Sequence, residues 1–477
     1  MRQQIGVIGG GLSGTLVVVH LLRKASHPLT IHLIERHPPI GRGVAYRTST
    51  SAHLLNIPAG SASAFADQPM DFLQFLQTLP DGKLMGGDPY HFLPRQLYGQ
   101  YLQSVLQKAI EQASPEVTLR VWQAEAVALS GKGWGSTAML QLDSGDRLLL
   151  DQVVLALGHF PPGDPVTGDP FFLNSQRYRH YAWDPAALSN LEPEATVLLI
   201  GSGLTMIDQV LALRAQGHRG LIEVVSRRGR LPLVHRFSSL GIPSKQATYT
   251  PLDPLTELPL TVRQVMRRVR WQVKVAASLG QDWRVVLDSL RPHLQALWQS
   301  WSITEQKRFL RHVRPYWEIH RHRTAPPVAE QIQQEIKAGS LRLYAGRITA
   351  IADDTEGVSV WIRRRQTQEA DYLRVARVIN CTGSQCSYRK LSHPLIINLQ
   401  EQGLIRPDPL ELGLDTAKDG ALLNQAGIPA DWLFTLGPPR KGNLWETTAI
   451  AEIRLQAEQL AQTLLERSAN PILSLRS

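Results

Sequence analysis

Apolar runs alternate with glycine turns along the chain in the order expected of an α/β protein. An apolar strand is predicted over residues 5–8, followed by glycines, an apolar helix to Leu22 and a second strand over residues 29–34. Strand, glycines and helix return over residues 196–213, and another strand follows over residues 221–225. Strands that alternate with helices favour a parallel sheet with helices on its faces. The fold class is therefore predicted to be α/β with two Rossmann-like units.

The first glycine turn has the spacing of a dinucleotide-binding site, Gly-x-Gly-x-x-Gly, between a strand and a helix. Gly9 permits a tight turn, Gly11 lets the backbone approach a pyrophosphate, and Gly14 lets the helix pack close to the strand. The diphosphate would lie at the helix N-terminus beside Leu12 and Ser13, where free N–H groups and the helix dipole favour negative charge. These five residues are candidate cofactor contacts.

An acidic residue ends the strand that follows the first helix. Glu35 comes twenty-one residues after Gly14, where a carboxylate accepts the hydrogen bonds of an adenosine ribose. Arg36, next to it, is included among the candidate cofactor contacts. A purely structural turn is the alternative, but strand, glycines, helix, strand and acid at these distances favour a bound dinucleotide.

The second glycine turn repeats the pattern with one departure. Gly201 and Gly203 separate a strand from a helix, and Met206 occupies the position of the third glycine. This helix is therefore expected to lie further from its strand than the first helix does. The alternative is a degenerate Rossmann unit that binds nothing.

The strand after the second turn ends in a hydroxyl and two guanidiniums, Ser226, Arg227 and Arg228, with no carboxylate. Such groups attract the 2′-phosphate of NADPH, so NADPH is predicted in preference to NADH. A solvated strand end is the alternative interpretation of the two arginines. The acid at the first turn and the arginines at the second predict FAD first and NADPH second.

Further segments extend the comparison beyond the glycine turns. They read Gly-Arg-Gly-Val-Ala-Tyr at 41–46, His-Leu-Leu-Asn-Ile-Pro-Ala at 53–59, Asp-Phe-Leu at 71–73, Pro-Arg-Gln-Leu-Tyr-Gly-Gln-Tyr-Leu at 94–102 and Trp-Glu-Ile-His-Arg-His-Arg at 317–323, before Ala-Pro at 325–326. In this order, over nearly the whole chain, they resemble FAD/NAD(P)-binding flavoproteins with two Rossmann domains. Within that class they resemble the proteins related to flavin-dependent N-hydroxylating monooxygenases.

The resemblance implies that Gly43, Asn56 and Arg95 lie around the FAD. Their alternative roles are a turn glycine, a turn-capping amide and a surface arginine. Ala62 departs from the family pattern, because a bulkier residue such as methionine is expected there. That departure leaves the shape beside the flavin open.

The same resemblance assigns later residues to the cofactors. Gly158 and Gly383 end apolar strands at which the chain crosses between domains, so their backbone would pass close to a nucleotide. Gly437, Asn443 and Trp445 lie before a long helix, where they would cap the ribityl phosphate or the flavin ring. A C-terminal helix that only closes the sheet is the alternative.

The architecture implied is an FAD-binding domain that the chain leaves and later re-enters. Residues 1–160 would form its first part and residues 378–470 its returning part, with an NAD(P)H-binding domain over residues 161–377. A helical insert is predicted within the second domain over about residues 254–330. The length of 477 residues is consistent with about three structural units.

The resemblance implies an FAD-dependent oxidoreductase that consumes NAD(P)H, specifically a monooxygenase acting on a small amine-like or related substrate. One alternative is an NADPH-dependent flavin reductase or oxidase that hydroxylates nothing. Another is a flavin-binding protein that docks on a partner or membrane through its insert. No catalytic acid or base is assigned, and neither the substrate nor the oligomeric state follows from the sequence.

Positive charge is concentrated in the predicted insert. The formal net charge is +10, and residues 261–325 carry thirteen Lys or Arg against four Asp or Glu. Five of the eleven tryptophans also fall within residues 254–330. A basic helix with tryptophan fits contact with an anionic membrane surface or a partner. Packing as a lid over the flavin domain is the favoured alternative, and no nucleic-acid partner is expected.

Cysteine and histidine usage gives weaker indications. Two cysteines do not form a disulfide framework, and no run of about 18 apolar residues predicts a membrane span, so a cytoplasmic location is expected. Cys381 and Cys386 are interpreted as small buried side chains in preference to a redox pair. The His-Arg-His-Arg run at 320–323 either binds a substrate or nicotinamide phosphate or ends a helix, and no metal-binding spacing is present.

Overall fold

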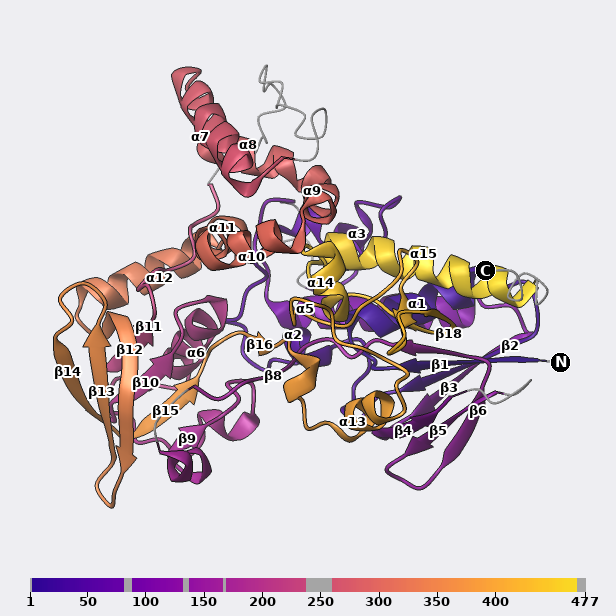
Figure 1. Ribbon diagram of the computed structural model, residues 1–477, viewed down its shortest axis with the longest axis horizontal. Helices are drawn as coiled ribbons and strands as arrows, with labels where there is room; N and C mark the ends of the chain where they lie inside the picture. Colours follow the sequence, from indigo (N-terminus) through magenta and orange to yellow (C-terminus); the bar gives the residue numbers. More distant parts are fainter. Residues whose placement is uncertain (1, 81–87, 132–136, 166–168, 237–259, 470–477) are drawn as a thin grey trace.

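The computed structural model describes residues 2–80, 88–131, 137–165, 169–236 and 260–469 (Figure 1). Two large sheets, each bearing one glycine turn, lie side by side, and a group of helices stands above them in Figure 1. The predicted fold class, α/β with two Rossmann-like units and a helical insert in the second, is confirmed. Residues 254–259, the predicted start of the insert, lie outside the described residues.

The first sheet has six strands in the order β17-β18-β7-β1-β2-β3. Its strands are β1 (Gln3–Ile8), β2 (Leu29–Ile34), β3 (Val117–Trp122), β7 (Gln152–Leu155), β17 (Ala421–Leu423) and β18 (Pro429–Thr435). Neighbouring strands from β18 to β3 are parallel, and β17 runs antiparallel to β18. The chain therefore returns to this sheet after it has built the second one.

The two faces of the first sheet carry separate cores, as expected of parallel strands buried on both sides. On one face α1 (Leu12–Lys24) packs against α5 (Arg95–Glu111) and α15 (Ile450–Ala469). The other face is covered by a small antiparallel sheet of β4 (Ala126–Ser130), β5 (Ala138–Leu142) and β6 (Arg147–Leu150) and by α13 (Pro394–Glu401). Short helices on this half are α2 (Gly43–Tyr46), η1 (Ala59–Ser61) and α3 (Asp71–Gln77).

The second sheet has seven strands in the order β14-β13-β12-β11-β10-β15-β9. They are β9 (Tyr178–Arg179), β10 (Val197–Ile200), β11 (Ile222–Ser226), β12 (Leu341–Asp353), β13 (Val358–Arg364), β14 (Ala370–Val375) and β15 (Arg377–Asn380). Neighbouring strands from β9 through β15, β10 and β11 to β12 are parallel, and β12, β13 and β14 form an antiparallel edge. Helices α6 (Leu204–Ala215) and α12 (Pro326–Lys337) precede β11 and β12.

The helical insert connects β11 to α12. Its helices are α7 (Val262–Ser278), α8 (Trp283–Leu290), η4 (Arg291–His293), α9 (Leu294–Ser300), α10 (Ile303–His312) and α11 (Arg314–Arg321). Helices α7 and α8 stand away from both sheets, whereas α9 lies beside α14 (Lys441–Leu444) (Figure 1). In the part of the chain that the structure describes, no helix is long and apolar enough to cross a membrane.

Short elements complete the connections between the sheets. Strands β8 (Phe160–Pro162) and β16 (Ser384–Gln385) pair with each other where the chain passes between the halves. The remaining turns are η2 (Pro170–Asn174), η3 (Pro185–Ala187), η5 (Tyr388–Lys390) and η6 (Pro438–Arg440).

Candidate functional site

Steric limits at the first turn admit only glycine at two positions. Gly9 has a φ of +107°, and a Cβ there would lie 2.4 Å from the Ala156 carbonyl oxygen. A Cβ on Gly14 would lie 1.8 Å from the carbonyl oxygen of Gly9. Gly11 is less crowded, since the nearest atom to its Cβ position is the Gly43 Cα at 3.4 Å. The turn is thus tight where strand meets helix and open where a phosphate would approach.

The carboxylate of Glu35 is fixed at the end of β2 by the turn itself. Its Oε2 accepts a hydrogen bond from the Gly10 N–H at 2.7 Å, and its Oε1 accepts one from the His37 N–H at 2.8 Å. Arg36 lies on the surface at the strand end and pairs with Glu125 at 2.7 Å. Glu35 therefore lies directly beside the glycine turn, in the position that a ribose-binding acid requires.

The returning segment meets the first turn at Gly437. This residue has a φ of +72°, and a Cβ there would lie 2.9 Å from the Ser13 Oγ. The Gly437 N–H donates to Gln456 Oε1 at 3.0 Å, and the Thr447 hydroxyl donates to the Gly437 carbonyl at 3.0 Å. The end of β18, the start of α1 and the start of α15 therefore converge at one point.

Other predicted contacts of the first cofactor lie at the rim of this region. Gly43 has a φ of +49° and faces the backbone of Gly11. Gly158 has a φ of +62° and open space around its Cβ position. The Asn56 carbonyl accepts a hydrogen bond from His235 Nε2 at 2.8 Å, which ties this loop to the segment before the insert. Their contact with FAD stays a prediction.

Arg95 lies in a buried ion pair that the sequence did not indicate. Its Nη1 and Nη2 donate to the two carboxylate oxygens of Asp208 at 2.8 and 3.1 Å, and its Nε donates to the Leu54 carbonyl. Asp208 belongs to α6, so the pair joins α5 of the first half to α6 of the second. The Asp208 carbonyl is 2.8 Å from His53 Nε2. A lone carboxylate in an otherwise apolar helix was the signal that could have revealed Asp208.

The second turn has the same left-handed backbone conformation as the first. Gly201 has a φ of +108°, and a Cβ there would lie 2.8 Å from the Cys381 carbonyl oxygen. Gly203 has nothing within 4 Å of its Cβ position, so the backbone is open to a ligand. Met206, at the third glycine position, is fully buried in the core between α6 and the sheet.

Ser226 closes the loop that follows β11. Its hydroxyl accepts hydrogen bonds from Ser202 Oγ at 2.8 Å and from the Gly229 N–H at 3.0 Å. Ser202 also has a second contact, to the Arg230 carbonyl at 2.6 Å. The glycine turn and the strand end are thereby held as one unit.

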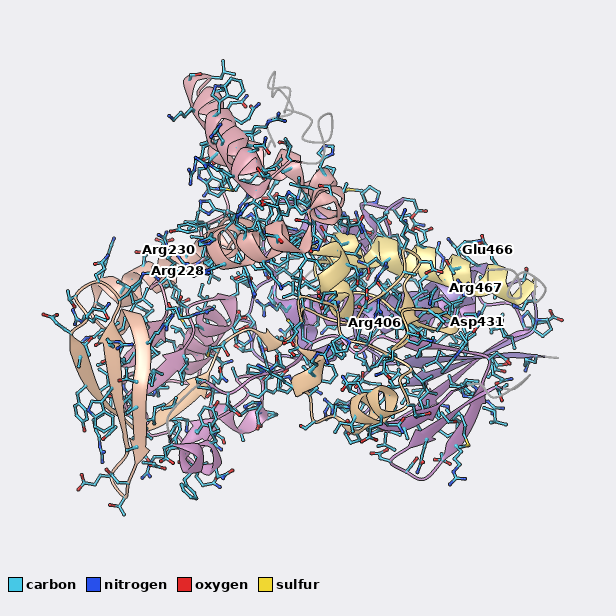
Figure 2. All side chains as sticks on the ribbon, viewed as in Figure 1. Arg228, Arg230, Arg406, Asp431, Glu466 and Arg467 are labelled. Carbon is cyan, nitrogen blue, oxygen red and sulfur yellow. The ribbon has the colours of Figure 1, made fainter. Side chains whose placement is uncertain are left out.

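Three guanidiniums surround this unit. Arg227 is exposed, and Arg228 and Arg230 lie over the ring of Tyr316 at 5.5 and 4.6 Å. Figure 2 shows Arg228 and Arg230 together where the second sheet meets the insert. Within the described residues no carboxylate pairs with any of the three. Arg230 was not among the sequence candidates, although its place two residues after Arg228 could have indicated it.

Two predicted contacts of the C-terminal segment are next to the insert, Trp445 through its ring and Asn443 through its backbone carbonyl. The buried ring of Trp445 stacks on Trp298 of α9 at 5.1 Å and meets Phe309 edge-on at 5.1 Å. The Asn443 side chain donates to Asp415 Oδ1 at 3.3 Å. Both residues lie beside the insert in this structure, and their role in holding FAD stays a prediction.

A buried group of charges joins α11 to the start of α15. Arg321 Nε lies 3.4 Å from Glu446 Oε2, and its Nη2 lies 3.5 Å from Glu452 Oε1. Arg291 donates two hydrogen bonds to the same Glu452 oxygen at 3.1 and 3.0 Å, and Trp317 donates to Glu446 at 3.0 Å. Arg321 Nε and Nη2 and Glu452 Oε2 are buried without hydrogen bonds. Buried polar atoms that lack hydrogen-bond partners are typical of sites that bind water or a polar ligand.

The remaining members of the His-Arg-His-Arg run have structural contacts. His320 Nδ1 is 2.7 Å from the Tyr316 carbonyl, and Arg323 pairs with Asp288 at 2.8 Å. Burial lowers the pKa of His322, against the opposing effect of Glu446. The run therefore ends a helix, and its arginines bind carboxylates from neighbouring segments.

The two cysteines are free thiols. Burial raises the pKa of the Cys381 thiol well above its usual range, so the reactive thiolate form is disfavoured. Gly383, between them, has nothing within 4 Å of its Cβ position. The interpretation of Cys381 as a small buried side chain accords with this environment.

Comparison with known proteins agrees with this geometry. Residues 6–160 match the family model described as FAD-NAD(P)-binding. A curated L-aspartate N-monooxygenase from Streptomyces davaonensis is 30% identical over 290 residues, which cover 51% of this chain and 44% of that protein. The chain thus spans less than half the length of this relative.

Solved structures extend the likeness to nearly the whole chain. L-lysine 6-monooxygenase from Pseudomonas syringae gives a TM-score of 0.67 at 17% identity, covering 98% of this chain and 100% of that one. Ornithine hydroxylase from Pseudomonas aeruginosa gives 0.65 at 14% identity, covering 98% and 100%. The chain has the fold of FAD/NAD(P)-binding flavoproteins with two Rossmann domains. Its predicted resemblance to the N-hydroxylating monooxygenases of that class is confirmed.

Proposed function

We propose that this protein is an FAD-containing, NADPH-consuming monooxygenase that oxidises the nitrogen of a small amine. The observation that carries the proposal is the contrast between the two turns. The first places a carboxylate beside the glycines, and the second places three arginines there that pair with no carboxylate among the described residues. An acid suits an unphosphorylated ribose, and arginines suit a 2′-phosphate. The matched relatives are named as L-aspartate N-monooxygenases, which supports an amine substrate.

The first turn fits a bound FAD on steric grounds. No side chain has room at Gly9 or Gly14, and the first turn of α1 leaves backbone N–H groups free for a diphosphate. When bound, FAD supplies the redox chemistry by which NADPH and O₂ convert the amine to its hydroxylamine, with NADP⁺ and water as products. The chain's own part is to hold both nucleotides and exclude water. Glu35 orients the ribose, and Arg228 and Arg230 hold the 2′-phosphate.

The cofactor contacts that we propose are those expected from the sequence, with Arg230 added. They are Gly9, Gly11, Leu12, Ser13, Gly14, Glu35, Arg36, Gly43, Asn56, Arg95, Gly158, Gly437, Asn443 and Trp445 for FAD, and Gly201, Gly203, Ser226, Arg227, Arg228 and Arg230 for NADPH. Gly383 is proposed to lie close to one of the two nucleotides. The same proposal divides the chain into an FAD domain over residues 1–160 and 378–470 and an NADPH domain over residues 161–377. With one exception, the strands of each large sheet fall within these ranges, which supports the division. The exception is β15 (Arg377–Asn380), which belongs to the second sheet and crosses the proposed boundary at residue 377. A cytoplasmic location fits the two free thiols.

Anaerobic stopped-flow spectroscopy of the FAD-loaded protein tests the cofactor assignment. Mixing with NADPH is expected to bleach the flavin absorbance much faster than mixing with NADH. Readmission of O₂ with an amine substrate is then expected to restore the absorbance with formation of an N-oxygenated product. A plain oxidase would form peroxide alone, and a protein bleached by neither nucleotide would contradict the proposal.

Exchange of both Arg228 and Arg230 for alanine is expected to weaken NADPH binding and leave NADH binding unchanged. Hydrogen bonds to charged groups contribute about 1.5–3 kcal/mol each, so the loss corresponds to at least about tenfold in Kd. Titration of the FAD-loaded protein with each nucleotide measures the effect. Arg363→Ala, an exposed arginine of β13 in the same sheet, is the matched control. Equal losses for NADPH and NADH would exclude a 2′-phosphate contact.

Part of the same proposal is contact between α7 and an anionic membrane surface. Arg263, Arg267, Arg270 and Lys274 recur on its exposed face, and Trp271 among them is 56% exposed. The helix contains no acidic residue and stands away from the two sheets (Figure 1). A basic stripe with a tryptophan fits phospholipid head groups, at about 1 kcal/mol per cation near the surface.

Vesicle sedimentation at low salt tests this contact. The protein is expected to pellet with vesicles containing phosphatidylglycerol and to stay in solution with phosphatidylcholine vesicles. The triple substitution R267E/R270E/K274E is expected to abolish pelleting, whereas Arg363→Glu leaves it intact. Pelleting that is unaffected by the triple substitution would contradict a membrane role. Binding of a nucleic acid as tight as the binding of the anionic vesicles would also contradict it.

A further inference from the structure

A cavity of about 370 Å³ lies between the insert and the C-terminal segment, and its lining includes no residue of either glycine turn. Gln299, Ile303 and Gln306 of the insert line one side. Lys418 and Arg440 belong to the opposite side, which is built from residues 408–410, 415–418, 440 and 442–444. The cavity is therefore walled by two parts of the chain more than about 100 residues apart.

Arg440 is a buried cation without an anion. It is only 6% exposed, and its Nη2 donates to the carbonyls of Ala417 and Lys418 at 3.1 and 2.8 Å. Its Nε has one long contact to Thr416 Oγ1 at 3.4 Å. Within the described ranges its Nη1 donates no hydrogen bond and no carboxylate pairs with it. Burial lowers the pKa of Arg440 to about 10, against the opposing effect of the Asp419 charge.

The carboxylates near the cavity are already bound by other groups. Asp408 accepts hydrogen bonds from three backbone N–H groups at 2.9, 2.6 and 2.6 Å. Asp415 is held by Arg406 at 2.6 Å, and Asp419 is held by Arg467 at 2.7 Å. Figure 2 shows Arg406 and Arg467 well apart, so Asp415 and Asp419 are each paired with a different arginine. The exposed Lys418 forms no ion pair among the described residues. Two cations, Lys418 and Arg440, therefore line the cavity without a paired carboxylate, against one carboxylate, Asp408, that only backbone N–H groups bind.

We propose that this cavity binds a small oxyanion, a carboxylate or a phosphate group of a metabolite, between Arg440 and Lys418. A buried charge without a counterion is strongly unfavourable, and an oxyanion supplies both the charge and the acceptors that Nη1 lacks. The ligand would be distinct from the two nucleotides and from the amine, and Asn443, a proposed FAD contact, would lie between this ligand and the FAD. It would touch α9, α10 and the segment next to α14, so its binding would fasten the insert to the first half of the molecule.

Calorimetric titration and thermal unfolding of the FAD-loaded protein test the proposal. Sodium phosphate and sodium succinate are the probes, each compared with sodium chloride at equal ionic strength. A saturable rise in Tm with one or both probes is expected, and comparison of the two identifies the preferred group. A response that matches chloride would overturn the proposal.

Two substitutions locate the binding without removing the structural Arg440. Lys418→Glu is expected to weaken the probe by about tenfold or more, since it reverses one of two charges at the anion. Ile303→Trp, from a side chain already 46% exposed, is expected to fill the cavity and abolish the response. Lys390→Glu, an exposed lysine elsewhere on the surface, is the control. Unchanged affinity in both cavity variants, or release of FAD by the probe, would assign the binding elsewhere.

Discussion

Gly14→Ala is expected to give a protein that does not retain FAD. The added methyl group would lie 1.8 Å from the carbonyl oxygen of Gly9 and 3.2 Å from the Ala156 Cβ, so it has no room. Relief requires α1 to move away from β1, which removes the helix N-terminus from the diphosphate. Such a substitution is expected to lower the free energy of unfolding by more than about 4 kcal/mol.

Flavin absorbance per mole of purified protein, with circular dichroism for the fold, measures this effect. Gly203→Ala is the matched control, because nothing lies within 4 Å of its Cβ position. It is expected to retain FAD and fold normally while it binds NADPH more weakly, since the methyl group projects into the space left for the nucleotide. Full FAD content in Gly14→Ala would contradict the assignment of the first turn.

Asp208→Ala is expected to lower the free energy of unfolding by about 3–5 kcal/mol, the usual cost of leaving one buried charge unpaired. The substitution leaves the buried guanidinium of Arg95 without its ion-pair partner, because Asp208 binds it through both carboxylate oxygens. Because the pair joins α5 to α6, the loss is expected to uncouple the two halves of the molecule as well. Urea unfolding of the FAD-loaded protein, followed separately by flavin fluorescence and circular dichroism, measures both effects.

A double substitution separates the ion pair from simple loss of packing. Arg95→Met combined with Asp208→Leu removes both charges and keeps much of the volume, so it is expected to be less destabilising than Asp208→Ala alone. Lys24→Ala, which removes a partly exposed pair with Glu458, is the surface control and is expected to cost less than about 1 kcal/mol. A change below about 1 kcal/mol for Asp208→Ala would show that the buried pair contributes little.

Local sequence was sufficient wherever function depends on backbone geometry. Spacing alone identified the glycines at positions 9 and 14, because both belong to one strand-turn-helix unit. The contact that excludes a side chain at Gly14 lies within that unit, whereas the contact at Gly9 is with the distant Ala156 carbonyl. Glu35 is close in sequence to the same unit, and its hydrogen bond to Gly10 lies within it. The fold class followed from the same repeated pattern.

Residues whose partners lie far along the chain could not be interpreted from spacing. Arg95 was assigned to FAD by resemblance, yet its carboxylate partner Asp208 is 113 residues away. Trp445 stacks on an insert tryptophan, Trp298, which no local pattern connects to it. Arg440 lies in a short basic segment that looks solvated, and only the folded chain buries it. In each case tertiary packing decides which partner a side chain meets.

Oxygen-18 labelling tests the central claim most directly. The FAD-loaded protein is supplied with NADPH, ¹⁸O₂ and a panel of small amines headed by L-aspartate, L-ornithine, L-lysine and cadaverine, and the products are analysed by mass spectrometry. An N-oxygenated product that carries ¹⁸O is expected for one of these amines, with NADPH consumed and NADH used poorly. NADPH oxidation with all of the ¹⁸O recovered as peroxide, whichever amine is present, would contradict it.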